Sequence, residues 1–135
     1  HRRRALRAFV QFVRVYHEYY DILVGCLRKT DLSKWPAVFE AAGNPLVIFD
    51  ECLETGRFAT AAHLLRVLQL PVSLGYGLDD AATPEAQTLQ EQAALTSAKR
   101  AARRLLPLVL RAHQFTLSQE LLRFMEMMDG EISPE

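Results

Sequence analysis

The stretch LETGRFATAAHLLRVL, residues 53–68, decides the fold class of this chain. After Gly56 its apolar residues recur every three or four positions, and Leu53 ends the similar series Leu46, Phe49 and Cys52 before it, which is the spacing of amphipathic helices. Small alanines between the leucines of the second half allow a neighbouring helix to approach closely. The connection Thr55-Gly56-Arg57 is short, and short connections join helices that lie antiparallel. The stretch therefore predicts a helical hairpin.

The same pattern returns 57 residues later, in LRAHQFTLSQELLRFM at residues 110–125. Without gaps, five of the sixteen positions are identical, among them the aromatic that follows the turn, Phe58 and Phe115. An aromatic at this place can lock two antiparallel helices together. Hairpins that repeat in this way bury their faces on one another and build an α-solenoid. We therefore predict an all-α fold, an α-solenoid-like stack of antiparallel helix pairs.

Start and stop signals along the chain predict about six helices. They are expected at residues 4–29, 33–42, 45–55, 57–69, 84–112 and 115–128. Gly43 is expected to end one helix in the left-handed conformation, and Asn44 to cap the next one, with Pro45 at its first position. Thr83 is expected to cap the helix that begins at Pro84.

Two segments interrupt the helical pattern. Residues 70–83 are rich in proline, glycine and aspartate and have little periodicity, so they are predicted to form an internal loop. Pro107 lies inside an otherwise helical stretch, where proline removes a backbone hydrogen bond. A kink or a break is therefore expected around residues 104–107. Gly130 is expected to end the last helix.

Length and composition indicate a single helical domain over residues 1–135, since half of the chain is apolar and 24% is charged. Because the chain begins with His1, we expect it to be a fragment of a longer protein. Its 16 basic and 16 acidic residues cancel, so no overall charge attracts nucleic acid or an anionic membrane. Cys26 and Cys52 lie in apolar helical patterns and are predicted to be free buried thiols, with a single disulfide as the alternative.

Basic residues gather at the beginning of the chain. Five arginines precede the first acid, Glu18. One interpretation is the solvated start of a helix, and the other is a basic patch for a phosphate, a lipid or an acidic partner. Arg3, Arg4 and Arg7 are the candidate partner-binding residues. Reversal of their charge is predicted to weaken binding and to reduce its dependence on salt.

Catalytic and metal-binding motifs are not found in the sequence. There is no phosphate-binding glycine loop and no zinc-protease motif, and the four histidines are scattered. The acid pair Asp50-Glu51 is predicted to be solvated on a helix, and Asp79-Asp80 to favour a turn. No apolar run approaches the roughly 18 residues that a membrane span needs. We therefore predict neither an enzyme nor a cofactor.

Four consecutive stretches carry a resemblance to a known family. They are RKTD at 28–31, LSKWPAVFEAAGNP at 32–45, LVIFDECL at 46–53 and TAAHLLRVLQ at 60–69. Together they resemble the C-terminal helical domain of the ribosome-control-protein family. Residues 98–128 are similar to the next part of that domain more loosely. The segment 71–95 is longer than the helix link of the family, and Pro107 interrupts a helix that is continuous there.

The resemblance implies the large subunit of a Golgi exchange factor for a Rab GTPase. Such a subunit would carry a β-propeller region before this domain and would act with an arrestin-like partner subunit. Together they would release nucleotide from a Golgi Rab GTPase of the six type, as a complex peripherally associated with the cytosolic face of the Golgi. The domain itself would be a non-catalytic scaffold, and no individual exchange residue is carried over.

Two other readings remain open from the residues alone. The solenoid pattern would equally suit a generic α-solenoid protein-interaction module of another membrane-trafficking tether or coat complex. A small helical enzyme or ligand carrier would need a pocket with convergent polar groups, which the sequence does not indicate. Nucleic-acid binding is the least favoured interpretation of the aromatic and basic residues near the start of the chain.

Overall fold

The computed structural model describes residues 2–14, 18–76 and 83–132, and within these ranges it contains seven α-helices, two 3-10 helices and no strand. The elements are α1 (Arg2–Val13), α2 (Tyr19–Arg28), η1 (Leu32–Lys34), α3 (Trp35–Ala42), α4 (Pro45–Glu54), α5 (Phe58–Leu68), η2 (Pro71–Leu74), α6 (Pro84–Arg111) and α7 (Phe115–Ile132). The predicted all-α class is confirmed.

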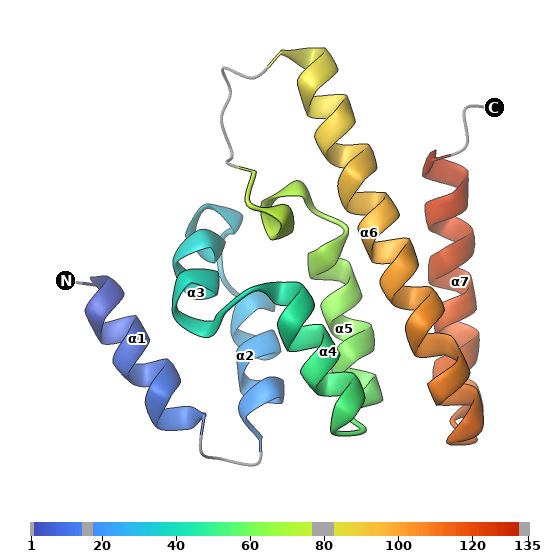
Figure 1. Cartoon of the computed structure of the whole chain (residues 1–135), viewed down its shortest axis with the longest axis horizontal. Helices are drawn as coiled ribbons and strands as arrows, with labels where there is room; N and C mark the ends of the chain where they lie inside the picture. The colour runs from blue at the N-terminus through green and yellow to red at the C-terminus, as the bar shows by residue number, and fades with distance from the viewer. Residues whose placement is uncertain (1, 15–17, 77–82, 133–135) are drawn as a thin grey trace.

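The helices stand side by side in a curved row from α1 at one end to α7 at the other (Figure 1). Helix α4 packs on α5, α5 on α6, and α6 on α7, so the two predicted hairpins are neighbours in the row. Their shared core contains Phe49, Leu64 and Leu105, each at most 1% exposed. Burial of one hairpin against the next is the packing of an α-solenoid.

The internal repeat extends to the backbone of the two hairpin turns. In the first turn the Arg57 N–H donates to the Cys52 carbonyl (2.8 Å), and 57 residues later the Gln114 N–H donates to the Val109 carbonyl (3.1 Å). These bonds close a helix end around one residue with positive φ. That residue is Gly56 in the first turn (φ 75°) and His113 in the second (φ 60°).

This difference between the turns predicts substitutions of opposite sign. A Cβ at position 56 would meet no atom within 4 Å, so Gly56→Ala should lower the free energy of unfolding by about 1 kcal/mol through backbone strain alone. His113→Gly should raise it by up to about 1 kcal/mol, because strain is relieved there. Chemical denaturation followed by circular dichroism checks both. A loss of similar size at both positions would show that the turns are not equivalent.

Helix signals read from the sequence are largely confirmed at helix starts. The Asn44 side chain accepts from the Leu46 N–H (2.8 Å), and the Thr83 hydroxyl accepts from the Ala86 N–H (3.1 Å). Pro45 and Pro84 occupy the first positions of α4 and α6. Gly43 ends α3 with a positive φ of 109°, but its ψ of −179° lies outside the left-handed helical region that was predicted.

The predicted single helix over residues 4–29 is wrong. Helix α1 ends at Val13 and α2 begins at Tyr19, and the two run antiparallel (Figure 1). One straight helix of that length would extend about 39 Å and would carry half of its apolar stripe beyond the core. Two shorter helices bury Val10 and Leu23 in the same core, at 2% and 5% exposure.

Arg14 and Trp35 hold this rearranged start of the chain together. The Arg14 Nη2 donates to the Ala42 carbonyl at the end of α3 (2.9 Å). The buried Trp35 indole Nε1 lies 3.1 Å from both the Leu27 and the Thr30 carbonyl oxygens, at the end of α2 and just after it. Trp35 therefore joins the end of α2 to α3.

Pro107 does not break the long helix. Helix α6 continues from Pro84 to Arg111, and α7 continues past Gly130, where it was expected to end. Pro107 is exposed, whereas Leu105 and Val109 face the core at 0% exposure. A proline on the solvent side is tolerated because long helices are convex there and water can satisfy the carbonyl of Arg103.

The predicted loop at 70–83 begins as packed structure. Val72 and Ser73 of η2 are buried, at 4% and 5% exposure. The Ser73 hydroxyl lies within hydrogen-bond distance of the Leu68 (3.0 Å) and Leu70 (2.8 Å) carbonyls. The remaining part of this prediction, at residues 77–82, lies outside the described residues.

Candidate interaction surface

The three candidate arginines lie exposed on α1, at one end of the helix row. Arg3 Nη1 lies 3.3 Å from Glu40 Oε2, and Arg7 Nη2 lies 3.6 Å from Glu40 Oε1. The structure thus brings Arg3 and Arg7 together at one carboxylate of α3. Exposed pairs of this kind contribute about 0–1 kcal/mol each. They help to hold α1 on α3, while their exposed guanidinium groups keep the surface basic.

An apolar groove of about 540 Å³ lies between α1 and α2, with α3 as its floor. Its walls are made mainly of aliphatic and aromatic side chains. They include Leu6, Phe9, Val10, Ile22, Ala37 and Val38. Phe9 and Ile22 remain 50% and 37% exposed, and Phe12 beside them is 56% exposed. Contiguous exposed apolar surface on a helical protein is typical of a binding site for another protein.

Polar groups stand at the two ends of this groove. Arg3 and Lys34 line it where α1 begins and α2 ends. Tyr19 lines the opposite end, is only 4% exposed, and its buried hydroxyl has no hydrogen-bond partner. The aromatic residues noted near the start of the sequence include Tyr19. The sequence did not indicate Lys34 or Cys26, because the groove exists only once the chain reverses between α1 and α2.

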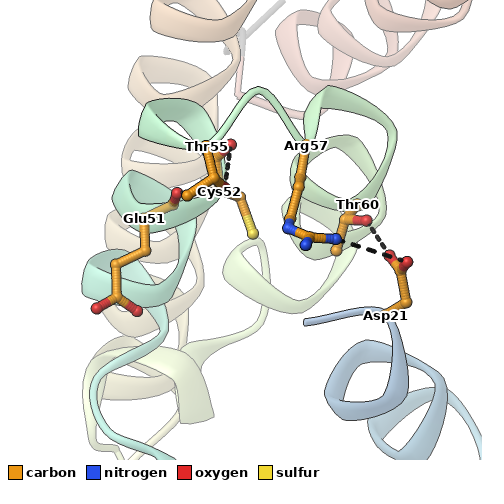
Figure 2. A network of polar contacts seen from close by, with 6 residues as sticks. All are labelled: Asp21, Glu51, Cys52, Thr55, Arg57 and Thr60. Carbon is orange, nitrogen blue, oxygen red and sulfur yellow. Dashed lines mark hydrogen bonds and ion pairs between the residues drawn. The ribbon is translucent and has the colours of Figure 1, made fainter. Parts of the chain in front are cut away.

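A polar network joins α2 to the first hairpin (Figure 2). The Asp21 carboxylate accepts from the Thr60 hydroxyl and lies 4.0 Å from Arg57 Nη1. The Arg57 guanidinium stands over the ring of Tyr20, 5.6 Å from its centroid. Asp21 therefore lies beside the first turn of α5, where the partial positive charge of the helix favours an anion. These contacts hold α2 on α5.

The thiol of Cys52, which Figure 2 draws beside this network, is unreactive. Cys52 is fully buried, and desolvation raises the pKa of its thiol to about 11, although the nearby Arg57 acts in the opposite direction. At neutral pH the thiol is therefore protonated, and a thiol must lose its proton to attack. Cys26, predicted to be buried, is exposed instead, and both cysteines are free, as predicted.

The two thiols should accordingly react at very different rates. In the folded protein near pH 8, we expect an aromatic disulfide reagent to modify Cys26 within minutes and to leave Cys52 unmodified. Denaturant should expose the second thiol, so that two are titrated per chain. The Cys26→Ala variant is the control and should show no fast reaction. Rapid modification of both thiols in the folded protein would contradict the burial of Cys52.

The acid pair Asp50-Glu51 makes contacts within the fold. Arg104 Nη1 lies 2.6 Å from Asp50 Oδ1, and Glu51 Oε1 accepts from the Tyr20 hydroxyl (3.2 Å), so this acid pair is engaged rather than simply solvated. His63 is exposed on α5. Asp79 and Asp80 lie outside the described residues. Within the described ranges no group of three metal-binding side chains comes together.

Membrane insertion through a helix finds no support in the described part of the chain. None of the helices there combines the length and the apolar character needed to cross a bilayer.

The helical stack agrees with what comparison with known families finds. The model of the RIC1 C-terminal alpha solenoid region matches residues 1–135. The chain belongs to this family. The family description names the architecture that the hairpins form, and it covers both copies of the internal repeat. No solved structure matches the chain.

Relatives in this family are described as subunits of guanine nucleotide exchange factors. One from Caenorhabditis elegans is 31% identical over 83 residues, which is 62% of this chain and 6% of the relative. The ric1 subunit of Schizosaccharomyces pombe is 39% identical over 51 residues, 38% of this chain and 5% of the relative. The human RIC1 subunit is 36% identical over 64 residues, 47% of this chain and 4% of the relative. The chain thus spans only a small part of each RIC1 relative.

Proposed function

We propose that this chain is a non-catalytic interaction scaffold within a RIC1-type subunit of a Rab guanine nucleotide exchange factor that acts in Golgi vesicle trafficking. The observation that carries the proposal is the family match over the whole chain, together with the relatives described as exchange-factor subunits. The partners are an arrestin-like subunit of the same complex and a Golgi Rab GTPase of the six type. The complex would hold the domain peripherally at the cytosolic face of the Golgi.

A scaffold is sufficient for this role because nucleotide exchange forms and breaks no covalent bond. An exchange factor needs surfaces that bind the nucleotide-free GTPase more tightly than the loaded one, so that binding shifts the equilibrium toward nucleotide release. Rigid stacks of helices present such surfaces in fixed relative positions. The inert Cys52 and the packed acids of this chain are consistent with a structural part of such a complex.

A pull-down with the 135-residue chain as bait tests the proposal. The preys are the arrestin-like subunit and the Golgi Rab, the latter nucleotide-free and GTP-loaded in separate arms. Capture of the subunit, or of nucleotide-free Rab in preference to GTP-loaded Rab, is the expected result. Capture of neither by bait that circular dichroism shows to be helical would contradict it.

Charge reversal at Arg3, Arg4 and Arg7 tests which surface takes part. We expect the triple Arg→Glu variant to weaken partner binding about fivefold or more and to flatten its dependence on salt. Part of that loss could come from a loosened α1, because Arg3 and Arg7 pair with Glu40. Glu40→Gln separates the two effects, since it frees both arginines without removing their charge. Binding that survives Glu40→Gln and falls in the triple variant supports direct contact, whereas equal losses would assign the arginines a structural role only.

A further inference from the structure

The groove between α1 and α2 exists because α1 packs on α3 more than on α2. The two helices are consecutive and antiparallel (Figure 1), yet in the described residues α1 packs chiefly on α3. The groove between α1 and α2 is therefore lined by apolar side chains of α1, α2 and α3. A groove lined in this way has the form in which helical proteins receive a further helix.

The distance between the ends of the groove sets the length of its occupant. Arg3 lies in the first turn of α1 and Val13 at its end, and both line the groove. Ten residues of helix rise about 15 Å, so the groove accommodates about three turns of a helix laid along it. Three turns present apolar side chains at positions i, i+3 or i+4, and i+7 to one wall.

Charge favours an occupant with an acid at one end. Lys34 lines the groove beside Arg3, and the exposed Arg28 and Lys29 follow at the end of α2 nearby. Glu40 near this end is already shared between two arginines, and the exposed Asp31 before η1 is outnumbered by the basic side chains. An acidic side chain of a partner would therefore meet net positive charge where α1 begins.

At the opposite end of the groove, the Tyr19 hydroxyl lacks a hydrogen-bond partner. This hydroxyl is buried without a partner, which is costly for a polar group and rare in folded proteins. Arg14 stands over the Tyr19 ring, 5.7 Å from its centroid, and does not satisfy the hydroxyl. A single acyl chain has one polar head and could serve only one end of the groove. A peptide offers polar groups at both ends.

We propose that this groove binds an amphipathic helix of a partner protein, about three turns long, with an acidic side chain against Arg3 and Lys34 and a hydrogen-bond acceptor for the Tyr19 hydroxyl. The inference rests on the proposed function only in treating the chain as an interaction scaffold. It adds the site and the chemistry of the segment that the site receives.

The test is selection from a display library of 14-residue helical peptides against the 135-residue chain. The selected peptides are expected to carry leucine or phenylalanine at i, i+3 or i+4, and i+7, with aspartate or glutamate at one end. Ala37→Trp places an indole on the groove floor and should abolish their binding. Ala8→Trp, on the exposed side of α1 outside the groove, is the matched control and should bind normally. If Ala37→Trp fails to fold, Cys26→Trp fills the groove from its exposed wall instead.

Two substitutions at the ends of the groove separate the polar contacts. Lys34→Glu should weaken the selected peptides about fivefold, whereas Arg103→Glu, at an exposed position of α6 far from the groove, should change binding little. Tyr19→Phe should also weaken them about fivefold, and it should leave the unliganded chain at least as stable, since it removes an unsatisfied hydroxyl. If Tyr19 had only a structural role, Tyr19→Phe would lower the stability of the unliganded chain.

Other outcomes would overturn the inference. These are failure to enrich any peptide sensitive to Ala37→Trp, displacement of the peptides by a fluorescent long-chain fatty acid with higher affinity, or concentration-dependent dimers in sedimentation that Ala37→Trp abolishes. None of these outcomes changes the result of the pull-down that tests the proposed function. The inference about the groove and the proposed function can therefore fail separately.

Discussion

Phe49→Ala will lower the free energy of unfolding by about 3–5 kcal/mol. Phe49 lies on α4 at 0% exposure and is the largest of the fully buried side chains. Its removal leaves a cavity in the core between the hairpins, in addition to the lost transfer of the ring out of water. A domain of this size is stable by only about 5–15 kcal/mol, so the variant should be close to unfolded at physiological temperature.

Urea denaturation followed by far-ultraviolet circular dichroism measures this loss. Val47→Ala is the matched control, because it lies on the same helix two residues away and is 53% exposed. Its expected change is within about 0.5 kcal/mol. Similar losses for the two variants would mean that α4 does not present Phe49 to the core.

Pro107→Ala should raise the free energy of unfolding by about 1–3 kcal/mol. Alanine restores a backbone donor for the carbonyl of Arg103 and removes the clash of the ring with that turn. The position is exposed in the interior of α6, so the substitution disturbs no packing in the core. The same denaturation experiment reports the gain as a higher midpoint.

Arg100→Ala, at another exposed position of α6, serves as the control and should change stability by less than about 0.5 kcal/mol. If Pro107→Ala lowered the free energy of unfolding instead, the curvature imposed by the proline would be needed for α6 to pack on both α5 and α7. The helix would then gain more from packing than from a straight backbone.

Local chemistry explains what the sequence determined by itself. Asn44 and Thr83 cap helices because their side-chain oxygens reach backbone donors two or three residues away, whatever the rest of the chain does. The turn at Gly56 and its repeat at His113 likewise depend on a few consecutive residues. The all-α class, the hairpins, the repeat and the resemblance to an exchange-factor subunit could therefore be predicted before the structure was seen.

Contacts between distant residues decided the rest. The apolar stripe of residues 4–29 is continuous in the sequence, and packing of α1 on α3 and of α2 on α5 favours two helices over one. Pro107 is tolerated because it faces solvent, and the periodicity of one helix does not show how the core approaches it. The pairing of Arg3 and Arg7 with Glu40, and the groove that ends at Tyr19, join segments brought together by the same reversal. The free energies of caps and turns depend on neighbouring residues and can be predicted from the sequence. The free energy of burial depends on which surfaces meet, and only the tertiary structure decides that.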